Sequence, residues 1–424
     1  MTPQLPYDAL VVGAGPGGAT AATFMARAGL RVLLVDKDRF PRDKTCGDAL
    51  SGKTVDVLRR LGIVDAVEAG PSLVAWGILF SSPYGSEVDV QFCDPATATT
   101  APGYVMARTD FDALVVDAAR TAGAEVWEET TVTGLVREGT RVTGATLKRG
   151  GETQTVHARV VVGADGAYSA VARALGFDQL DERHYCAGLR QYWEGVTGFH
   201  DHNLIELHFV DEAIPGYFWI FPMANGRANV GIGMLSSEIK KRDVRLKDVL
   251  KACIAHPRFA DRFKDARPLE KIHGYGLPLG SRPRPLSGDG WMLVGDAASL
   301  IDPFSGEGIG NAMVSGEFAA RHAVLALTGA PAGGDGAAST VMPGVASAAR
   351  LSGYDRDVMA YLGGELRLSH IMQRLGRRKW LLHFVIDQAA RKPAIKKALS
   401  TMFEDEQARA QLKSPLFYLR ALLS

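Results

Sequence analysis

The feature that most constrains this chain is the stretch of residues 8–18 near its start, in which a short apolar run breaks into a cluster of glycines. The apolar run predicts a buried strand, and the alanine-rich residues 19–28 predict a helix after it. Between them, Gly13 permits a tight turn, Gly15 lets the backbone approach a pyrophosphate, and Gly18 lets helix and strand pack closely. Such a turn is typical of a nucleotide-binding strand–helix unit.

The residues after this helix support the same interpretation. A second strand, residues 31–35, ends in Asp36, where a carboxylate can accept hydrogen bonds from an adenosine ribose. A pyrophosphate would meet the exposed N–H groups and the positive dipole end of the first helix. A glycine turn without a ligand is the alternative, but strand, glycines, helix, strand and acid come in the order of a dinucleotide site. The cofactor-binding residues predicted here are Gly13, Gly15, Pro16, Gly17, Gly18, Asp36 and Lys37.

Composition narrows the class of protein. The 424 residues are enough for two or three domains, and 46% hydrophobic with 22% charged residues is ordinary for a globular protein. A formal net charge of +1 gives no basic field that would suggest nucleic acid as a partner. The four cysteines have no paired spacing, which argues against a structural metal site or a disulfide scaffold and suits a reducing cytosol. They are Cys46, Cys93, Cys186 and Cys253.

We expect neither a targeting segment nor a membrane-spanning one. The chain enters its first strand almost at once, which leaves no room for a signal peptide. No apolar run reaches the roughly 18 residues of a spanning helix. A cytoplasmic location is therefore the expectation.

Two later segments repeat the pattern of an apolar run that ends in glycine and an acidic residue. Residues 160–162 form an apolar run that ends in Gly163-Ala164-Asp165-Gly166, and residues 291–294 form another that ends at Gly295-Asp296. Between these two segments, apolar and polar residues alternate and aromatic residues become more frequent. The pair Asn225-Gly226 separates two apolar runs and is a strong hairpin signal. This middle part predicts an antiparallel sheet beside the nucleotide domain.

Local patterns give further expectations. Residues 125–133 and 141–148 are expected to be strands. A helix is expected to begin near Thr109 or Asp110, either of which is a plausible N-cap. Arg108, just before that cap, is either a ligand of a phosphate or ribityl oxygen or a surface arginine.

Three nucleotide-handling segments in this order resemble the flavoprotein superfamily that includes the aromatic hydroxylases. The resemblance extends to about Leu327. It implies FAD rather than NAD, with Asp296 at the ribityl chain and the helix after Gly308 directed at the pyrimidine edge of the flavin. That placement is physically reasonable, because reduced flavin carries negative charge near N1 and a helix N-terminus stabilises an anion.

More narrowly, the chain resembles the geranylgeranyl reductase family in three places. These are the cysteine-glycine loop Lys44–Asp48, the YxWxFP segment Tyr217–Pro222 with its following GxG, and the DPxxGEGI loop Asp302–Gly310. Asp48 departs from the pattern, since a second glycine is frequent there. The family implies FAD-dependent saturation of prenyl carbon–carbon double bonds on diphosphates, ether lipids or quinone tails.

The resemblance completes the predicted fold and site. The fold class is α/β, with a Rossmann-type FAD-binding domain (residues 1–70, 103–180 and 281–327), an adjoining antiparallel-sheet substrate domain (71–102 and 181–280), a linker (328–349) and a C-terminal helical region (350–424). Further cofactor-binding residues are Cys46, Gly47, Asp48, Arg108, Asp165, Gly295, Asp296, Gly306, Gly308 and Ile309. Substrate-binding residues are Tyr217, Trp219, Phe221, Pro222, Gly231 and Gly233; the alternative for the three aromatic residues is plain sheet core, since aromatic residues favour strands.

Cys46 is the candidate catalytic residue. Hydride addition to one alkene carbon leaves the other in need of a proton, and an unactivated alkene has no carbonyl to help. A thiol in an apolar pocket stays protonated near neutral pH and could supply that proton directly or through water. The alternative is a small residue that fills a turn.

Other functions stay open. A flavin-dependent monooxygenase or halogenase of the same fold is the main alternative, although the halogenase strand pattern WxWxIP differs from this chain at Tyr217 and Phe221. A flavin-bound electron carrier or a non-catalytic lipid-binding protein is a third. No second GxGxxG unit follows a strand, so the external reductant, either NAD(P)H or a ferredoxin, has no dedicated domain.

The C-terminal region suggests peripheral contact with a membrane. An apolar stripe lies beside a basic cluster, a combination that can rest on anionic head groups. The commoner alternative is an amphipathic helix packed on its own protein. The stripe is Ile371, Met372, Leu375, Leu382 and Val385, and the cluster is Arg374, Arg377, Arg378 and Lys379.

Overall fold

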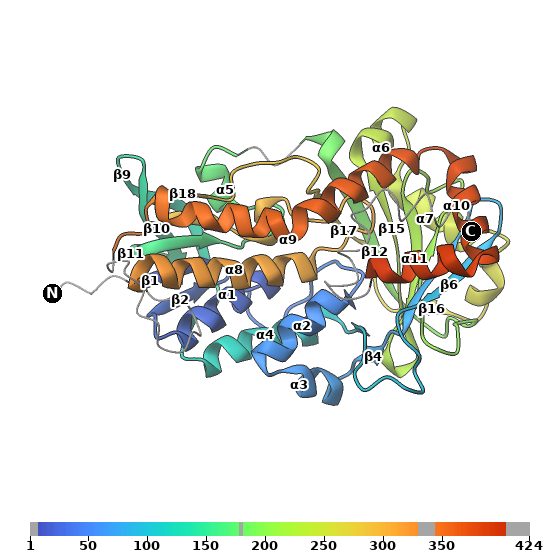
Figure 1. Ribbon diagram of the computed structural model, residues 1–424, viewed down its shortest axis with the longest axis horizontal. Helices are drawn as coiled ribbons and strands as arrows, with labels where there is room; N and C mark the ends of the chain where they lie inside the picture. Colours follow the sequence, from blue (N-terminus) through green and yellow to red (C-terminus); the bar gives the residue numbers. More distant parts are fainter. Residues whose placement is uncertain (1–6, 178–180, 330–343, 404–424) are drawn as a thin grey trace.

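The computed structural model describes residues 7–177, 181–329 and 344–403. Its described part contains two eight-stranded sheets and a small three-stranded one. In Figure 1 the first large sheet lies on the left and the second on the right, and the long helix α9 (Ala348–Leu375) runs from the first toward the second. The predicted α/β class, with a parallel and an antiparallel part and a helical C-terminal region, is confirmed.

The first sheet has a parallel core in the order β19-β11-β1-β2-β8. Leu10 of β1 pairs with Val161 on one side and Leu33 on the other, so the apolar runs predicted as strands lie next to one another. Their side chains are fully buried, which explains why the runs are apolar throughout rather than alternating. The bounds are β1 (Tyr7–Val12), β2 (Val32–Val35), β8 (Glu125–Trp127), β11 (Glu152–Gly163), β18 (Ser287–Gly288) and β19 (Trp291–Leu293).

One predicted strand is wrong. Residues 125–133 form two strands instead of one, because Glu129 takes a φ of 52° in the left-handed region and turns the chain between them. The second of these, β9 (Thr130–Glu138), pairs antiparallel with β10 (Arg141–Arg149), which pairs antiparallel with β11. The sheet therefore extends into a three-stranded antiparallel arm.

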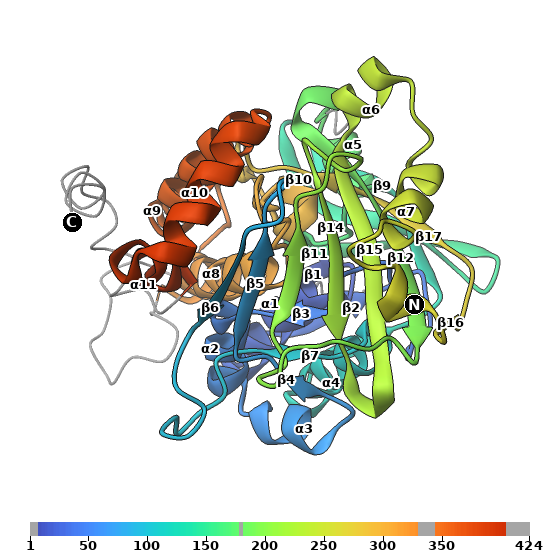
Figure 2. The same cartoon turned by 90° about the vertical axis from the view of Figure 1, so that its right-hand side faces the viewer.

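The second sheet has the order β16-β12-β15-β14-β13-β5-β6, with β17 also paired to β12. Its centre is the predicted hairpin, which is confirmed: Asn225 and Gly226 both have positive φ, at 61° and 68°, between β14 and β15. Figure 2 faces this sheet. The bounds are β5 (Gly77–Ser81), β6 (Glu87–Gln91), β12 (Tyr185–Glu194), β13 (Ile205–His208), β14 (Tyr217–Pro222), β15 (Arg227–Leu235), β16 (Arg267–Pro268) and β17 (His273–Pro278).

A short sheet, β3-β7-β4, connects the two. Its strands are β3 (Ala49–Leu50), β4 (Leu73–Val74) and β7 (Tyr104–Val105), and β3 directly follows the cysteine-glycine loop. The loop is therefore anchored between the two large sheets.

Helices α1 (Pro16–Arg27) and α8 (Ile309–Thr328) cross at unusually close range. A Cβ on Gly316 of α8 would lie 2.2 Å from the carbonyl oxygen of Gly17 in α1, so glycine on each helix lets the backbones touch. The other helices are α2 (Gly52–Leu61), α3 (Val64–Ala69), α4 (Arg108–Thr121), α5 (Ala170–Ala174), α6 (Ser236–Arg242), α7 (Leu246–Ile254), α10 (Lys379–Arg391) and α11 (Pro393–Phe403).

Two boundary predictions need correction. Helix α4 begins at Arg108 with Ala107 as its N-cap, so Thr109 and Asp110 lie inside the first turn and neither caps the helix. Helix α9 begins at Ala348, inside the segment predicted as a linker; residues 330–343 of that segment lie outside the described residues. Helices α9 to α11 fill the C-terminal region as far as Phe403, and residues 404–424 also lie outside the described residues.

Helix α9 joins the first sheet to the loop before α8. Near its start, the hydroxyl of Tyr354 donates to the carbonyl of Leu293 at 2.7 Å, in the first sheet. Near its end, the Gln373 amide donates to the carbonyl of Pro303 at 2.7 Å. Among the described helices, none is both long enough and apolar enough to cross a bilayer.

The close packing at the first turn predicts the effect of Gly18→Ala. The added Cβ would lie 1.9 Å from the carbonyl oxygen of Gly13, so helix α1 must shift away from β1. Overpacking of this kind costs about 1–3 kcal/mol, and the unfolding free energy should fall by that amount in chemical denaturation. Gly134→Ala in β9 is the control, because its Cβ would meet no atom within 4 Å. Equal stability of the two variants would mean that the turn accepts the added methyl group without a shift of α1.

Candidate functional site

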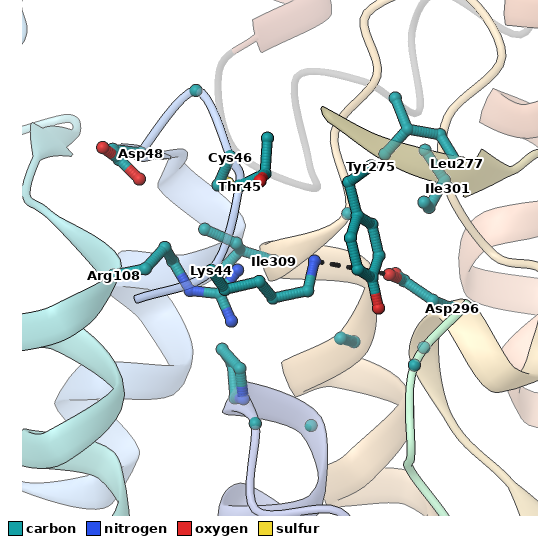
Figure 3. A pocket seen from close by; sticks show the side chains of 18 of the residues that line it. Lys44, Thr45, Cys46, Asp48, Arg108, Tyr275, Leu277, Asp296, Ile301 and Ile309 are labelled. Atoms are coloured by element: carbon teal, nitrogen blue, oxygen red, sulfur yellow. Dashed lines mark ion pairs between the residues drawn. The ribbon is translucent and has the colours of Figure 1, made fainter. Parts of the chain in front are cut away.

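A cavity of about 780 Å³ lies where the two large sheets meet. It is lined by every predicted cofactor-binding residue except Gly18, and by Tyr217, Trp219, Phe221 and Gly233 of the predicted substrate-binding set. Segments far apart in the chain thus meet around one space, part of which is seen in Figure 3.

The glycine turn forms one end of the cavity. Gly13 has a φ of 97°, and a Cβ there would lie 2.4 Å from the carbonyl oxygen of Ala164. Beyond Gly15 the space is open: a Cβ there would approach only the guanidinium of Arg42, at 3.9 Å, among the described residues. Helix α1 begins at Pro16, so its unpaired N–H groups face this open space.

Two carboxylates that line the cavity hold nearby backbone, Asp36 at the glycine turn and Asp165 at the start of α5. Asp36 at the end of β2 accepts hydrogen bonds from the backbone N–H of Ala14 at 2.7 Å and of Asp38 at 2.9 Å. Burial raises the pKa of Asp36, and those two hydrogen bonds oppose the rise. Asp165 accepts from the N–H of Ala170 at 2.6 Å, and burial raises its pKa as well. Both acids therefore fix backbone while they line the cavity.

Asp296, which follows strand β19, lies close to Lys44 of the cysteine-glycine loop. Figure 3 shows the ammonium of Lys44 directed at Asp296, with 3.8 Å between Nζ and Oδ2. The same ammonium lies 4.2 Å from the centre of the Tyr275 ring. Burial lowers the pKa of Lys44, and the carboxylate of Asp296 opposes that change. Helix α8 begins beside this group at Ile309, with Gly308 as its N-cap.

Arg108 is buried in the cavity wall rather than on the surface. Its guanidinium forms two hydrogen bonds to Asp112, at 2.6 and 2.7 Å, and lies beside the thiol of Cys46. Burial opposes its charge, but Asp112 and Cys46 together outweigh burial and raise the pKa of Arg108. Arg42 shares the same partner, at 2.8 Å from Asp112, so one carboxylate holds two cations at the cavity.

Two aromatic residues of the YxWxFP segment each pack on a glycine of another motif. The Tyr217 hydroxyl would lie 2.9 Å from a Cβ on Gly306, and it donates to the carbonyl of Ser305. The Phe221 ring would lie 2.9 Å from a Cβ on Gly47. These contacts attach the β14 strand to the loop before α8 and to the cysteine loop.

Trp219 packs within its own sheet. A Cβ on Gly231, in the neighbouring strand, would lie 2.2 Å from the indole, so only glycine leaves room for it. The indole N–H donates to the side-chain oxygen of Asn229 at 2.8 Å. Gly231 therefore supports the cavity without lining it, and Pro222 pairs with Ala228 at the end of β14, also outside the cavity lining.

Asn229 links that tryptophan to the cysteine loop. Its buried amide nitrogen donates to the carbonyl oxygen of Cys46 and to Oδ2 of Asp48, each at 2.8 Å. The hydroxyl of Tyr192 also donates to that Asp48 oxygen, at 2.5 Å. The position of Cys46 thus depends on hydrogen bonds from two strands of the second sheet.

The backbone at Asp48 takes a conformation that is uncommon for residues other than glycine. Its φ of 66° lies in the left-handed region, which glycine adopts without strain. The carboxyl is fully buried, and burial raises its pKa to about 6, against the hydrogen bonds of Tyr192 and Asn229 and the charge of Arg190. Arg190 is itself buried over the Tyr192 ring at 3.9 Å.

Several residues around the cavity were missed in the sequence. Motif glycines and motif acids are recognisable because of their spacing, whereas most of these residues carry no local pattern. Glu307 lies in the recognised DPxxGEGI loop but was not selected. Lys44 lies in the recognised cysteine-glycine loop but was not selected as a site residue. For Arg42, the one feature that could have indicated a role was its place in a charged loop that follows the glycine turn and Asp36. The missed residues are Arg42, Lys44, Tyr192, Asn229, Tyr275 and Glu307.

The residues present fit a flavin dinucleotide. The space in front of Gly15 is open, two helix N-termini face the cavity, and carboxylates stand at the ends of β2 and β19. The other end of the cavity is lined by Ile78, Ile205, Leu207 and the three aromatic residues, which suits an apolar molecule.

Comparison with known proteins agrees with this geometry. The family described as FAD binding domain matches residues 6–330. A digeranylgeranylglycerophospholipid reductase from Methanosarcina mazei is 35% identical over 328 residues, 76% of each chain. A menaquinone reductase from Mycobacterium tuberculosis is 34% identical over 320 residues, 74% of this chain and 76% of that protein.

A solved structure shows the same fold. The crystal structure of a geranylgeranyl bacteriochlorophyll reductase-like protein from Thermoplasma acidophilum matches with a TM-score of 0.78 and 27% identity. The match covers 94% of this chain and 99% of that one.

The buried carboxyl of Asp48 predicts a pH-dependent stability. In the folded protein its pKa is about 6, above the ordinary value of 3.8. Its contribution to the free energy of unfolding is therefore fully present below pH 3.8 and is lost as the pH rises through about 6. Relative to Asp48→Asn, whose amide stays neutral and keeps an acceptor oxygen, the wild type should lose about 3 kcal/mol over that interval. Urea unfolding across the interval measures this, with the exposed Asp56→Asn as control. Parallel pH profiles for wild type and Asp48→Asn would disprove it.

Proposed function

The chain belongs to the geranylgeranyl reductase family of FAD-binding proteins, and from this premise we propose that it saturates carbon–carbon double bonds of a polyprenyl substrate with FAD as its cofactor. The observation that carries the proposal is the single cavity, which joins a dinucleotide turn at one end to an aromatic, apolar wall at the other. The names of the relatives favour a lipid or a quinone tail as the substrate, and both share a polyprenyl chain.

We assign the cavity residues to the two molecules by their chemistry. The adenylate end of FAD would lie on the turn Gly13–Gly17 with Asp36 at the ribose, and the cation of Arg42 is close enough to that turn to meet the pyrophosphate. The Asp296 carboxylate and the start of α8 would hold the ribityl chain and the pyrimidine edge. The division into an FAD-binding and a substrate domain, with the boundaries expected from the sequence, is part of this proposal.

In this cavity, one alkene carbon would receive a hydride from FAD that is bound and reduced. The second carbon then needs a proton, for which Cys46 is the proposed donor. Its loop is fixed by Asn229, and the guanidinium of Arg108 beside it would stabilise the thiolate left behind. Water would restore the thiol between turnovers. The aromatic wall of Tyr217, Trp219 and Phe221 would hold the chain and exclude water from the reacting bond.

We further propose that the protein contacts membranes at the corner formed by the end of α9 and the start of α10. Of the nine strongly exposed large apolar residues in the described part of the chain, five lie here, at Ile371, Leu375, Trp380, Phe384 and Val385. Exposed arginines stand among them at 374, 377 and 378. An apolar surface with cations fits an anionic bilayer, which is where a prenyl lipid or quinone resides.

The reductase proposal is tested with purified, FAD-loaded protein that is chemically reduced and mixed with geranylgeranyl lipids or menaquinone. Mass spectrometry should find products with added pairs of hydrogen atoms. Consumption of oxygen in step with substrate, with an oxygen or halogen atom in the product, would favour the monooxygenase or halogenase alternative instead.

Cys46→Ala should retain FAD and lose about 10²- to 10⁴-fold in turnover, the usual contribution of a general acid. Cys93→Ala is the matched control, because Cys93 lies outside the cavity lining. Flavin content is read from absorbance and turnover from product mass. Unchanged turnover in Cys46→Ala would remove the proton-donor role while leaving the reductase proposal in place.

Flotation with anionic vesicles tests the membrane corner. The wild type should float, and the double change Trp380→Ser with Phe384→Ser should reduce the floating fraction several-fold, as should joint replacement of Arg377, Arg378 and Lys379 by Gln. Leu269→Ser, an exposed apolar residue outside the corner, is the control. Equal flotation of all variants would refute this contact.

A further inference from the structure

A second, smaller chamber of about 200 Å³ lies under the C-terminal helices. One wall comes from α9 and α10. The opposite wall comes from Phe80 of β5, Phe209 just after β13, and Phe304 of the loop before α8. Most of the helical wall is apolar, although α9 also contributes Glu365 and Ser369. The apolar members are Met372, Leu375, Leu381, Leu382, Val385 and Ile386.

This chamber adjoins the flavin cavity. Ser51, Ser305 and Glu307 line both spaces, so these side chains form the partition between them. The Ser51 hydroxyl donates a hydrogen bond to the Glu307 carboxylate, and the buried ammonium of Lys53 lies 3.0 Å from the same carboxylate. A partition made of side chains can open by a change of rotamer, without movement of the backbone.

Charge at the inner end of the chamber selects against anions. Among the described residues that line it, Lys53 is the one cation, and the same lining holds three carboxyl groups, Asp302, Glu307 and Glu365. The Lys53 ammonium already pairs with Glu365 at 2.8 Å and donates to the side chain of Asn311 at 2.7 Å. A diphosphate or phosphate head group would meet excess negative charge here, whereas a hydrocarbon chain end would not.

The outer end of the chamber reaches the surface beside the proposed membrane corner. Leu375 and Val385 line the chamber and are also exposed, at 45% and 40%. Figure 2 shows α10 next to the β5–β6 edge of the second sheet. The chamber thus lies between the apolar surface and the flavin cavity.

We infer that this chamber is a binding site for the uncharged, distal end of the prenyl chain, which extends into it past the Ser51–Glu307 partition while a double bond lies at the flavin. The inference deepens the proposed reductase function and rests on it for the identity of the chain. It makes the C-terminal helices a determinant of chain length: a long chain fills both spaces, whereas a short one ends in the flavin cavity.

Photolabelling of the FAD-loaded full chain tests the site without catalysis. The probes are geranylgeraniol and geraniol, each with a diazirine on its last isoprene unit. After irradiation, the longer probe should label the α9–α10 wall, at residues such as Met372 and Leu381, and the shorter probe should label only residues of the flavin cavity. Labelling of the flavin cavity alone by both probes would overturn the inference.

A filling variant adds a functional readout. Leu381→Trp should occupy the chamber, lower wall labelling by geranylgeraniol about tenfold or more, and slow its reduction while that of geraniol is unchanged. Ala390→Trp places the same indole on an exposed site of α10 outside the chamber and should change neither. If Leu381→Trp slowed the reduction of geraniol as much as that of geranylgeraniol, the result would contradict a chain-binding role for the chamber.

The two proposals can fail separately. If the wild type reduces neither prenol although its flavin reduces normally, and the wall is still labelled, the reductase function fails and the hydrocarbon site stands. If reduction proceeds but the wall is never labelled, the reductase function stands and the chamber inference fails.

Discussion

The side-chain amide of Asn229 is the interaction on which the site depends. Its oxygen accepts from the Trp219 indole, and its nitrogen donates to both the Cys46 carbonyl and Asp48, so the amide uses its oxygen and both N–H groups toward the site. The residue is fully buried, and loss of its amide would remove the hydrogen-bond partner of the buried Trp219 indole N–H, at a cost of about 1–3 kcal/mol. One side chain therefore fixes the proposed proton donor relative to the substrate wall.

The motif glycines leave room for aromatic side chains as well as giving the backbone conformational freedom. Gly47 makes room for Phe221, Gly231 for Trp219, and Gly306 for the Tyr217 hydroxyl. In each case a Cβ would come closer than 3.0 Å to the aromatic side chain, a distance that close-packed interiors do not tolerate. The aromatic segment and the two glycine loops are thus complementary shapes, which explains why they occur in the same chain.

The sequence predicted the elements that carry a local signal. The glycine turn, the apolar strands and the Asn-Gly hairpin all depend on residues within a few positions of one another, and all were confirmed. The strand at 125–133 was wrong because nothing in the pattern marks Glu129 as a left-handed residue. The expected caps of α4 failed because Arg108 belongs to the helix and pairs with Asp112 one turn later.

Long-range partners could not be predicted in the same way. Asn229 lies 183 positions from Cys46, and Lys53 lies 312 from Glu365, so only the folded chain brings them together. Lys44 stood in a recognised loop, yet its contact with Asp296 and Tyr275 depends on strands much later in the sequence. Composition and periodicity carry no information about such pairs.

The loop before α8 connects the two spaces physically. Gly306, with a φ of 74°, lets the loop turn beneath Tyr217, and the next glycine, Gly308, caps the helix whose N-terminus faces the proposed flavin site. Glu307 between them is held toward Ser51 and Lys53, on the partition. The same short turn therefore directs a helix dipole at the proposed flavin site and closes the inner end of the chamber. Because the opposite wall belongs to α9 and α10, changes in those helices would alter the chamber without disturbing the flavin-facing loop.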